Sequence, residues 1–243
     1  MNQWDPPPVQ FSLDDDRVDV WLIDVRDASG DLESFTASLS QAERERAAKF
    51  KFAKDRRLFV VAHAALRSIL AGYLELAPDS LQLDAGKNGK PVLAGILASS
   101  LVHFNLSHSH EIALLAVAPG REVGVDVEYV KRDFRFDDVA ERFFTPREVA
   151  ELRGLPHELQ RQAFFKCWTS KEAFLKAKGT GLSGKLDEVE ITLTGEQRVQ
   201  ISANVPDWSL IELFPGGDYE GALVVEGDAA LTRCYRWKPP LLA

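Results

Sequence analysis

Apolar residues repeat at helical spacing in two long stretches of the chain and cluster at strand-like spacing in several others. The first long helix is predicted by apolar positions three and four residues apart that end before Pro78: Leu58, Val61, Ala62, Ala65, Leu66, Ile69, Leu70 and Tyr73. A second helix is expected from about Glu158 to Lys178, with Gly179 as a left-handed cap. Runs rich in β-branched and aromatic residues predict strands at 18–25, 102–106, 112–117, 124–130, 189–193, 199–201, 209–214, 222–225 and 234–237.

Capping and turn residues divide these elements into two groups. Ser40 and Glu43 match a helix capping box, and Thr145-Pro146 is expected to open another helix. Pro119-Gly120 marks a break close to the middle of the chain. The predicted fold class is therefore α/β or α+β, with two similar halves, 1–119 and 120–243, each a long helix packed on a small sheet.

Composition narrows the class of protein. The chain has 243 residues, 45% of them hydrophobic, and a formal net charge of −8, which argues against bulk nucleic-acid binding. Its two cysteines are too few for a disulfide framework and fit a reducing compartment. The N-terminus has neither a basic start nor an apolar run, and no window approaches eighteen consecutive apolar residues. We therefore expect a cytoplasmic protein without a membrane partner.

Two carboxylates stand two residues apart in the strand expected at 124–130. Period-two alternation places Asp126 and Glu128 on the same face, with Val125 and Val127 on the other. Carboxylates this close repel unless a cation lies between them, and Mg²⁺ suits such a site because it binds one or two carboxylates together with phosphate oxygens. The alternative is a solvated strand face that happens to carry two acids.

A third carboxylate and an ammonium stand on the second long helix. Glu172 and Lys176 are four residues apart and share a helix face with Trp168. An ordinary pair of this spacing is worth only about 0.2–0.5 kcal/mol and needs no function. Its neighbours, Trp168, Lys171 and the loop that begins at Gly179, favour a site instead.

Ser107 and His108 stand at the end of the strand expected at 102–106. His108 is a candidate to donate to a phosphate oxygen or to transfer a proton. A nucleophilic Ser–His pair would need a base and an orienting group from elsewhere in the chain, and adjacent side chains on a strand diverge. A hydrolase triad is therefore disfavoured.

Together these segments resemble a known family. Gly124-Val-Asp-Val-Glu128 and the segment from Trp168 to Lys176 resemble the two defining motifs of the 4′-phosphopantetheinyl transferases, of the larger two-halved type that acts on carrier proteins. Gly89-Lys-Pro91, followed by Phe104-Asn-Leu-Ser-His-Ser109, resembles the upstream motif of that family. The resemblance runs from about Leu39 to Leu182.

The resemblance implies a pseudo-twofold fold with coenzyme A bound at the interface of the halves. Such an enzyme moves the phosphopantetheine group of coenzyme A to a serine of an apo acyl, peptidyl or aryl carrier protein and releases adenosine 3′,5′-bisphosphate. It implies Mg²⁺ held by Asp126, Glu128 and Glu172, with Glu172 as the first candidate for the general base. Contacts to coenzyme A are implied for Arg46, Lys87, Lys90, Ser107, His108 and Lys176. Since one chain builds the whole site, a monomer is expected.

Some positions, among them two histidines, depart from the family pattern, and two other functions stay open. His110 stands where the family often has glycine, and His63 stands where relatives commonly carry arginine. The same three acids could serve another metal-dependent phosphoester enzyme, such as a phosphodiesterase with water as the nucleophile. A non-catalytic protein that binds coenzyme A or carrier domains is the third possibility. The sequence does not indicate which carrier or pathway is served.

Overall fold

A computed structural model of the chain describes residues 2–12, 14, 16–28, 32–86, 90–180, 186, 189–196, 199–203, 205–228 and 231–239. Lys87, one of the expected contacts to coenzyme A, lies outside these residues, as does Gly89 of the upstream motif.

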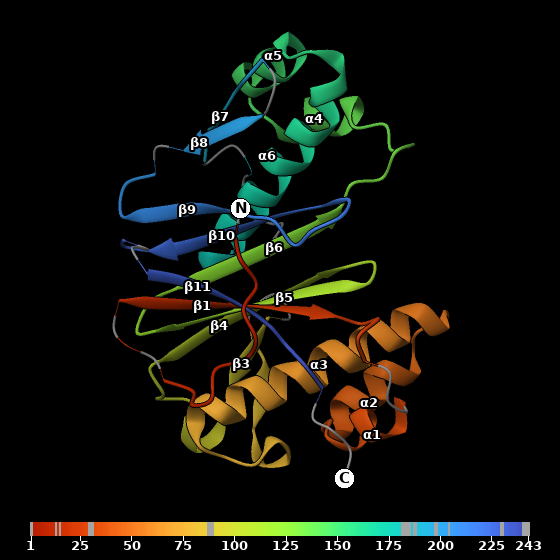
Figure 1. Ribbon diagram of the computed structural model, residues 1–243, viewed down its shortest axis with the longest axis vertical. Helices are drawn as coiled ribbons and strands as arrows, with labels where there is room; N and C mark the ends of the chain where they lie inside the picture. The colour runs from red at the N-terminus through yellow and green to blue at the C-terminus, as the bar shows by residue number, and fades with distance from the viewer. Residues whose placement is uncertain are drawn as a thin grey trace.

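The first sheet has four strands in the order β11-β1-β5-β4. β1 (Arg17–Asp24) is buried along its whole length, pairs antiparallel with β5 (Ile112–Pro119) and parallel with β11 (Leu231–Arg236). β4 (Val102–Ser109) is the edge strand beyond β5. Three helices cover one face of this sheet: α1 (Leu32–Ala37), α2 (Gln41–Ala48) and the long α3 (Ala53–Leu74) (Figure 1).

The second sheet has three strands in the order β6-β10-β9, all antiparallel. They are β6 (Val123–Tyr129), β10 (Tyr219–Glu226) and β9 (Trp208–Leu213). The long helix α6 (His157–Ala177) packs across this sheet. α4 (Asp137–Phe143), α5 (Pro146–Gly154) and the hairpin of β7 (Ile191–Thr194) and β8 (Gln200–Ala203) complete the outer end of this half.

The two sheets face each other, and strand alternation determines which residues meet between them. Val125 and Val127 of β6 and Leu223 of β10 pack against residues of the first sheet such as Val20 and Leu114. The neighbouring residues Ala222 and Val224 point the other way, onto α6. The resulting layers are helix, sheet, sheet, helix, with α3 in one helical layer and α6 in the other (Figure 1). The expected long helix on a small sheet in each half is confirmed.

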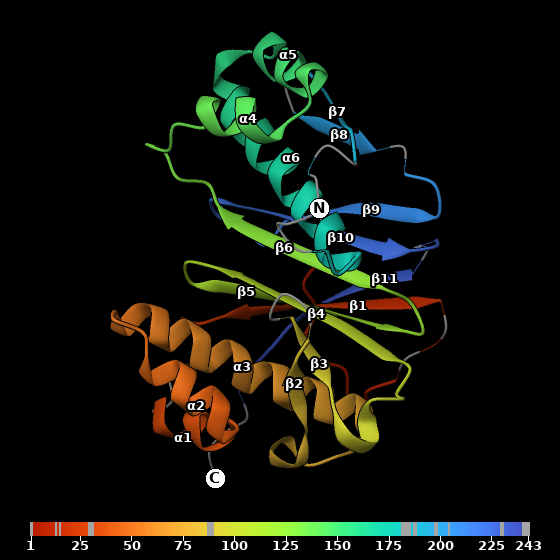
Figure 2. The same cartoon turned by 180° about the vertical axis from the view of Figure 1, so that it is seen from behind.

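A small hairpin lies at the side of β4. It consists of β2 (Leu83–Ala85) and β3 (Pro91–Leu93), flanked by the 3₁₀ turns Pro78–Ser80 and Gly95–Leu97. Figure 2, seen from behind, shows this hairpin below β4, on the same side of the molecule as the end of α6.

Helix α3 is long and apolar enough to cross a membrane by length and composition alone. However, 72% of its most apolar stretch is buried inside the protein. Phe59, Leu66 and Leu70 of α3 belong to the core it shares with Trp21 and Leu115 of the first sheet. α3 is therefore a core helix.

The last strand of the chain returns to the first sheet. β11 pairs with β1, with Val20 opposite Cys234 and Leu22 opposite Arg236. The C-terminal end thus contributes to the sheet of the N-terminal half, which the split of the sequence at 119 and 120 does not anticipate. The alternation of apolar residues marks β11 as a strand, but it carries no information about which sheet the strand joins. The division of the chain into those two halves stays a prediction.

Candidate active site where the two sheets meet

The site forms where β4 of the first sheet lies beside β6 of the second. The two strands belong to different sheets and are not paired through their backbones, so side chains of β4 make the hydrogen bonds to β6. Asn105 Oδ1 accepts from the amide of Val125 at 2.8 Å, and Ser107 Oγ donates to Asp126 Oδ1 at 2.8 Å. Ser109 Oγ donates to a carboxylate oxygen of Glu128 at 2.7 Å. Alternate residues of β4 therefore hold β6 in register and position both of its acids.

Lys176 enters the same cluster from α6. Its ammonium lies 2.6 Å from Asp126 Oδ1 and donates to Ser107 Oγ at 2.8 Å. Asp126 is only 4% exposed, so this ion pair offsets the cost of burying its charge. The structure thus brings Ser107, Asp126 and Lys176 into direct contact.

Two carboxylate oxygens of this cluster have no hydrogen-bond partner among the residues that the structure describes. Asp126 Oδ2 and Glu172 Oε1 are buried and accept no hydrogen bond within the described part of the chain. Leaving a buried acceptor unsatisfied costs about 1–3 kcal/mol, and more for a charged group. Hard oxygen donors of this kind are those that Mg²⁺ prefers, so both residues fit a divalent cation.

The charges around Glu172 show that the three acids influence one another. Burial raises the pKa of Glu172 to about 7, Asp126 and Glu128 add to the rise, and Lys176 opposes it. The pKa of Glu128 is also raised, first by burial and then by Asp126, while the hydrogen bond from Ser109 acts in the other direction. A cation would relieve this repulsion. Within the residues described, however, no group of three or more His, Cys, Asp or Glu side chains is already arranged as a complete metal site.

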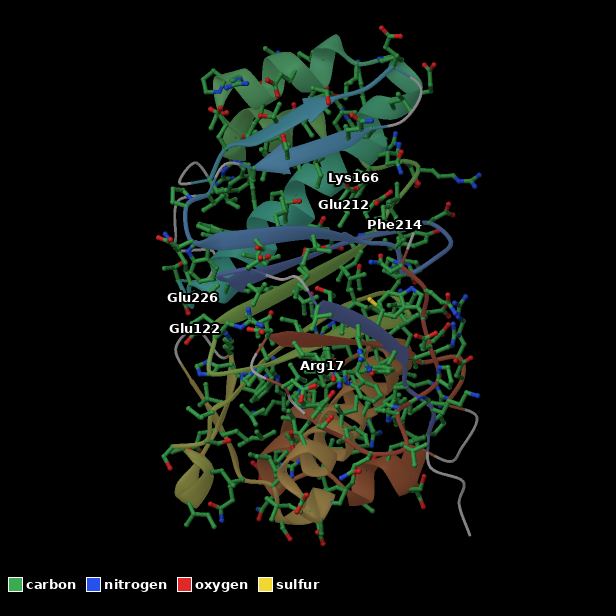
Figure 3. All side chains as sticks on the ribbon, turned by 60° about the vertical axis from the view of Figure 1, so that its left-hand side comes forward. Arg17, Glu122, Lys166, Glu212, Phe214 and Glu226 are labelled. Atoms are coloured by element: carbon green, nitrogen blue, oxygen red, sulfur yellow. The ribbon has the colours of Figure 1, made fainter. Side chains whose placement is uncertain are left out.

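Two buried lysines fix α6, which carries Glu172, against its surroundings. Lys171 lies 2.8 Å from Glu148 in an ion pair that is fully buried on both sides. Lys166 is paired with Glu212, and its ammonium lies 5.0 Å from the centre of the Phe214 ring (Figure 3). These contacts restrict the rotation and sliding of α6, so that Glu172 and Lys176 remain directed at β6.

A cationic group lies on the other face of β4, toward α2 and α3. Partial burial lowers the pKa of His108, and the nearby charges of His63, Lys176 and Arg46 lower it further, although His108 stays accessible to solvent. The guanidinium of Arg46 lies over the ring of Phe59, 5.2 Å from its centre. The guanidinium of Arg46 and the ring N–H of His108 are both donors that suit a phosphate ligand.

Glu43 anchors one side of that group. Its backbone and carboxylate complete the expected capping box with Ser40, so this prediction is confirmed. The carboxylate also lies 2.9 Å from His63 Nδ1 and accepts from Arg67 at 2.8 Å. Although burial opposes the change, His63 and Ser40 lower the pKa of Glu43 to about 2. His63 is therefore held by protein and is not directed freely at a ligand.

Lys90 connects the β2–β3 hairpin to the end of α6. Its ammonium donates to the carbonyl of Lys176 at 3.1 Å and lies 3.4 Å from that of Val123, with Glu122 4.0 Å away. Burial lowers the pKa of Lys90, and Lys176 adds to this effect. The ammonium thus lies at the negative end of the α6 dipole.

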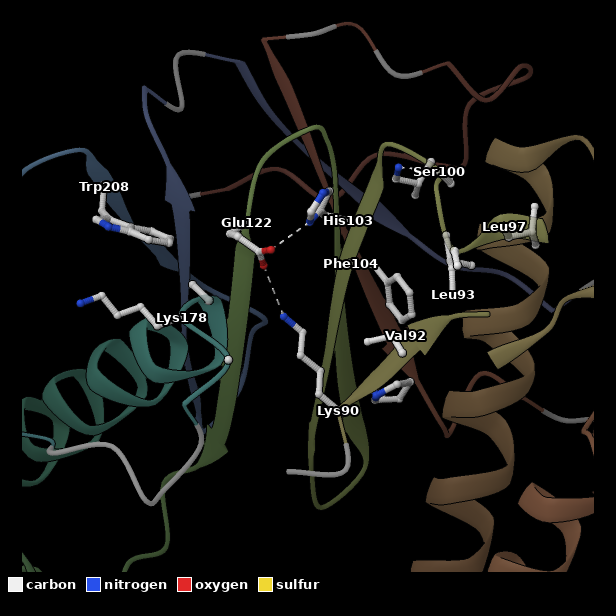
Figure 4. A pocket seen from close by; sticks show the side chains of 15 residues that line it. Lys90, Val92, Leu93, Leu97, Ser100, His103, Phe104, Glu122, Lys178 and Trp208 are labelled. Atoms are coloured by element: carbon white, nitrogen blue, oxygen red, sulfur yellow. Dashed lines mark hydrogen bonds and ion pairs between the residues drawn. The ribbon is translucent and has the colours of Figure 1, made fainter. Parts of the chain in front are cut away.

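A recess of about 590 Å³ opens beside Lys90, at the end of β4 and β6 away from the acids. Figure 4 shows Phe104 and Trp208 among its walls, with Lys178, His103 and Glu122 at its polar positions. Its size falls in the range typical of small-molecule sites.

The structure therefore divides the expected site residues into three places. Ser107, Asp126, Glu172 and Lys176 form one cluster, with Glu128 beside it on Ser109. Arg46 and His108 share the cationic face, and Lys90 bridges to α6. Asn105 and Ser109 were missed, although polar residues at every second position of 103–109 could have indicated that β4 faces a polar partner.

Comparison with known proteins identifies the family. Residues 122–224 match the 4′-phosphopantetheinyl transferase superfamily, and residues 26–120 match the N-terminal part of 4′-phosphopantetheinyl transferases. The 4′-phosphopantetheinyl transferase HetI of Nostoc sp. is 40% identical over 97% of this chain and 96% of its own length. The 4′-phosphopantetheinyl transferase psf-1 of Bacillus pumilus is 33% identical over 76% of both chains.

A similar solved structure is a holo-(acyl-carrier-protein) synthase from Bacillus anthracis in complex with CoA (3′,5′-ADP). It is 21% identical, has a TM-score of 0.36 and covers 44% of this chain and 96% of its own. From the matches over nearly the whole sequence, the chain belongs to the 4′-phosphopantetheinyl transferase family. The resemblance drawn from its motifs is confirmed.

Proposed function

We propose that this enzyme transfers the 4′-phosphopantetheine group of coenzyme A to a serine of an apo carrier protein, with Mg²⁺ held by Asp126, Glu128 and Glu172. Membership of the family supports the reaction. The observation that carries the metal assignment is the pair of buried oxygens Asp126 Oδ2 and Glu172 Oε1, neither of which has a hydrogen-bond partner in the described part of the chain. Glu128, held in place by Ser109, would join them through the carboxylate oxygen that Ser109 does not contact.

The protein's own groups would provide most of the charge stabilisation. When bound, the cation would neutralise charge on the pyrophosphate oxygens. Lys176 and Ser107 lie directly beside Asp126, so they would bind non-bridging oxygens on that side. His108 is accessible on the neighbouring face of β4 and would donate to a pyrophosphate oxygen.

Glu172 is the proposed general base. Without a cation, burial and Asp126 raise its pKa to about 7; a bound cation would lower that pKa and keep the carboxylate ionised, the form that accepts a proton. In the proposed step the carrier serine oxygen bonds to the β-phosphorus, and its proton passes to Glu172. The bond from that phosphorus to the bridging oxygen breaks, and adenosine 3′,5′-bisphosphate leaves with the electron pair.

Arg46 would bind a phosphate group at the nucleotide end of coenzyme A. Lys90 would do so only by giving up its hydrogen bond to the carbonyl of Lys176. The adjoining recess of about 590 Å³, with its aromatic walls, is large enough for a heterocycle such as adenine. We also infer a monomer, since one chain supplies every group of the proposed site, and a cytoplasmic location, which the two free cysteines fit.

The test measures the intact mass of an apo carrier protein after incubation with enzyme, coenzyme A and Mg²⁺. The expected result is the gain of one phosphopantetheine group, abolished in Asp126→Asn and Glu172→Gln. Glu141→Gln is the matched control, because Glu141 is an exposed acid paired with Arg153 on the surface. No mass gain across carriers of several pathways, or hydrolysis of coenzyme A without a carrier, would contradict the proposal.

A further inference from the structure

The turn that joins β4 to β5 contains an unusual backbone conformation next to the proposed site. Ser109 pairs with Ile112, so only His110 and Glu111 form the turn. His110 has φ of 56°, in the left-handed region that favours glycine. A side chain in this conformation is strained, and such positions persist where the surrounding structure holds them and often lie at functional sites.

The ring of His110 has a defined partner. It stacks on the ring of Tyr129, with 4.4 Å between ring centres and 13° between planes. Tyr129 in turn contacts Tyr219 edge to face at 5.3 Å, and the amide of Glu111 donates to the Tyr219 hydroxyl at 3.3 Å. The turn belongs to the first sheet, whereas both tyrosines belong to the second. The stack therefore ties the two sheets together.

This tie lies beside an acid of the proposed metal site. Ser109, next to His110 in sequence, accepts from the amide of Tyr129 at 3.1 Å and donates to Glu128 at 2.7 Å. Tyr129 follows Glu128 directly in sequence. The stacking of His110 on Tyr129 and the hydroxyl of Ser109 thus both connect the β4–β5 turn to the end of β6. The carboxylate of Glu128 is held at this connection.

We propose that His110 is a positioning residue for the transfer reaction. Its ring, stacked on Tyr129, locks the β4–β5 turn to the end of β6 and holds the Ser109 hydroxyl against Glu128. His110 acts through Tyr129 and Ser109 and touches neither the substrate nor the cation. The role in catalysis rests on the proposed function, whereas the lock itself is a property of the fold.

Two substitutions of His110 separate the effect of its ring from the effect of its backbone conformation. His110→Gly relieves the strained φ and removes the stack, so thermal stability should stay the same or rise. The hydrogen exchange of the Tyr129 amide should nevertheless accelerate by about two- to tenfold, the range expected for loss of one aromatic pair. Mn²⁺ affinity, measured by electron paramagnetic resonance, and kcat should fall, with little change in the KM for coenzyme A. His110→Phe keeps a stacking ring and should restore all three readouts.

The outcomes distinguish this inference from the proposed function. If wild-type enzyme transfers phosphopantetheine and binds Mn²⁺, but His110→Gly leaves amide exchange, Mn²⁺ affinity and kcat unchanged, the inference alone is wrong. A His110→Phe variant as impaired as His110→Gly would also overturn it. If the wild type neither binds Mn²⁺ nor transfers the group, the proposed function fails. The exchange rate of Tyr129 still decides whether the stack locks the turn.

Discussion

Replacing Gly124 by alanine should separate α6 from β6 and disable the enzyme. A methyl group at Gly124 would lie 2.0 Å from the carbonyl oxygen of Ala173 and 2.4 Å from the amide nitrogen of Ala177. Both are backbone atoms of α6, so no side-chain rotation can relieve the clash. The helix carries Glu172 and Lys176, whereas the strand carries Asp126. The contact therefore sets the distance between the acids on the two elements.

The size of the effect follows from how short the contacts of the added methyl group would be. Ordinary carbon contacts begin near 3.5 Å, so helix and strand must move apart by roughly 1.5 Å. Overpacking of this kind typically costs about 1–3 kcal/mol. For a chain of this size the melting temperature should fall by about 2–12 °C. A displacement of about 1 Å at reacting groups can cost on the order of 10²-fold in rate, so kcat/KM should fall at least that far.

Mass spectrometry of the carrier gives the rate, and calorimetry gives the melting temperature. Gly154→Ala is the matched control, because a methyl group there meets no atom of the described residues within 4 Å. It should retain both activity and stability. If Gly124→Ala transferred phosphopantetheine at the wild-type rate with an unchanged melting temperature, the close packing of α6 on β6 would not be what aligns the acids.

Three other substitutions test the charges and the polar contacts. Glu172→Gln should be more stable than wild type at pH 8 by roughly 1–3 kcal/mol without divalent cations. The wild type loses this amount of folding free energy as pH rises from 4.5, the ordinary pKa of glutamate, through about 7, the raised pKa of Glu172. Urea unfolding should therefore show no difference between variant and wild type at pH 4. Asn105→Ala leaves the buried amide of Val125 without its acceptor and should cost about 1–3 kcal/mol by urea unfolding. Lys171→Met leaves the buried charge of Glu148 without its ion-pair partner and should lower the free energy of unfolding by about 3–5 kcal/mol. Adding Glu148→Gln should recover part of that loss.

Local regularities of the sequence were enough to predict the long helices and the face shared by the strand acids. The apolar spacing from Leu58 to Tyr73 predicts α3, which ends at Leu74. Period-two alternation places Asp126 and Glu128 opposite Val125 and Val127, and the two valines indeed lie in the core between the sheets. These features depend on the backbone geometry of a single element, which the pattern of its own residues specifies.

Contacts across elements could not be predicted in the same way. Lys176 is four residues from Glu172 in the helix, yet its ammonium lies 2.6 Å from Asp126 of β6. The hydrogen bond of Lys90 to the carbonyl of Lys176, and the position of β4 beside β6, depend on how distant segments pack. His110 has φ of 56° because a two-residue turn favours a positive φ, a conformation that residues other than glycine adopt infrequently.

One divalent cation should bind between the oxygens of Asp126 and Glu172. Anomalous diffraction from crystals grown with Mn²⁺ and coenzyme A tests it directly. We predict a single strong peak at about 2.0–2.2 Å from Asp126 Oδ2 and Glu172 Oε1, which are typical ligand distances for a cation of this kind. A peak held by other residues, or well-ordered coenzyme A with no peak between these two acids, would contradict the account.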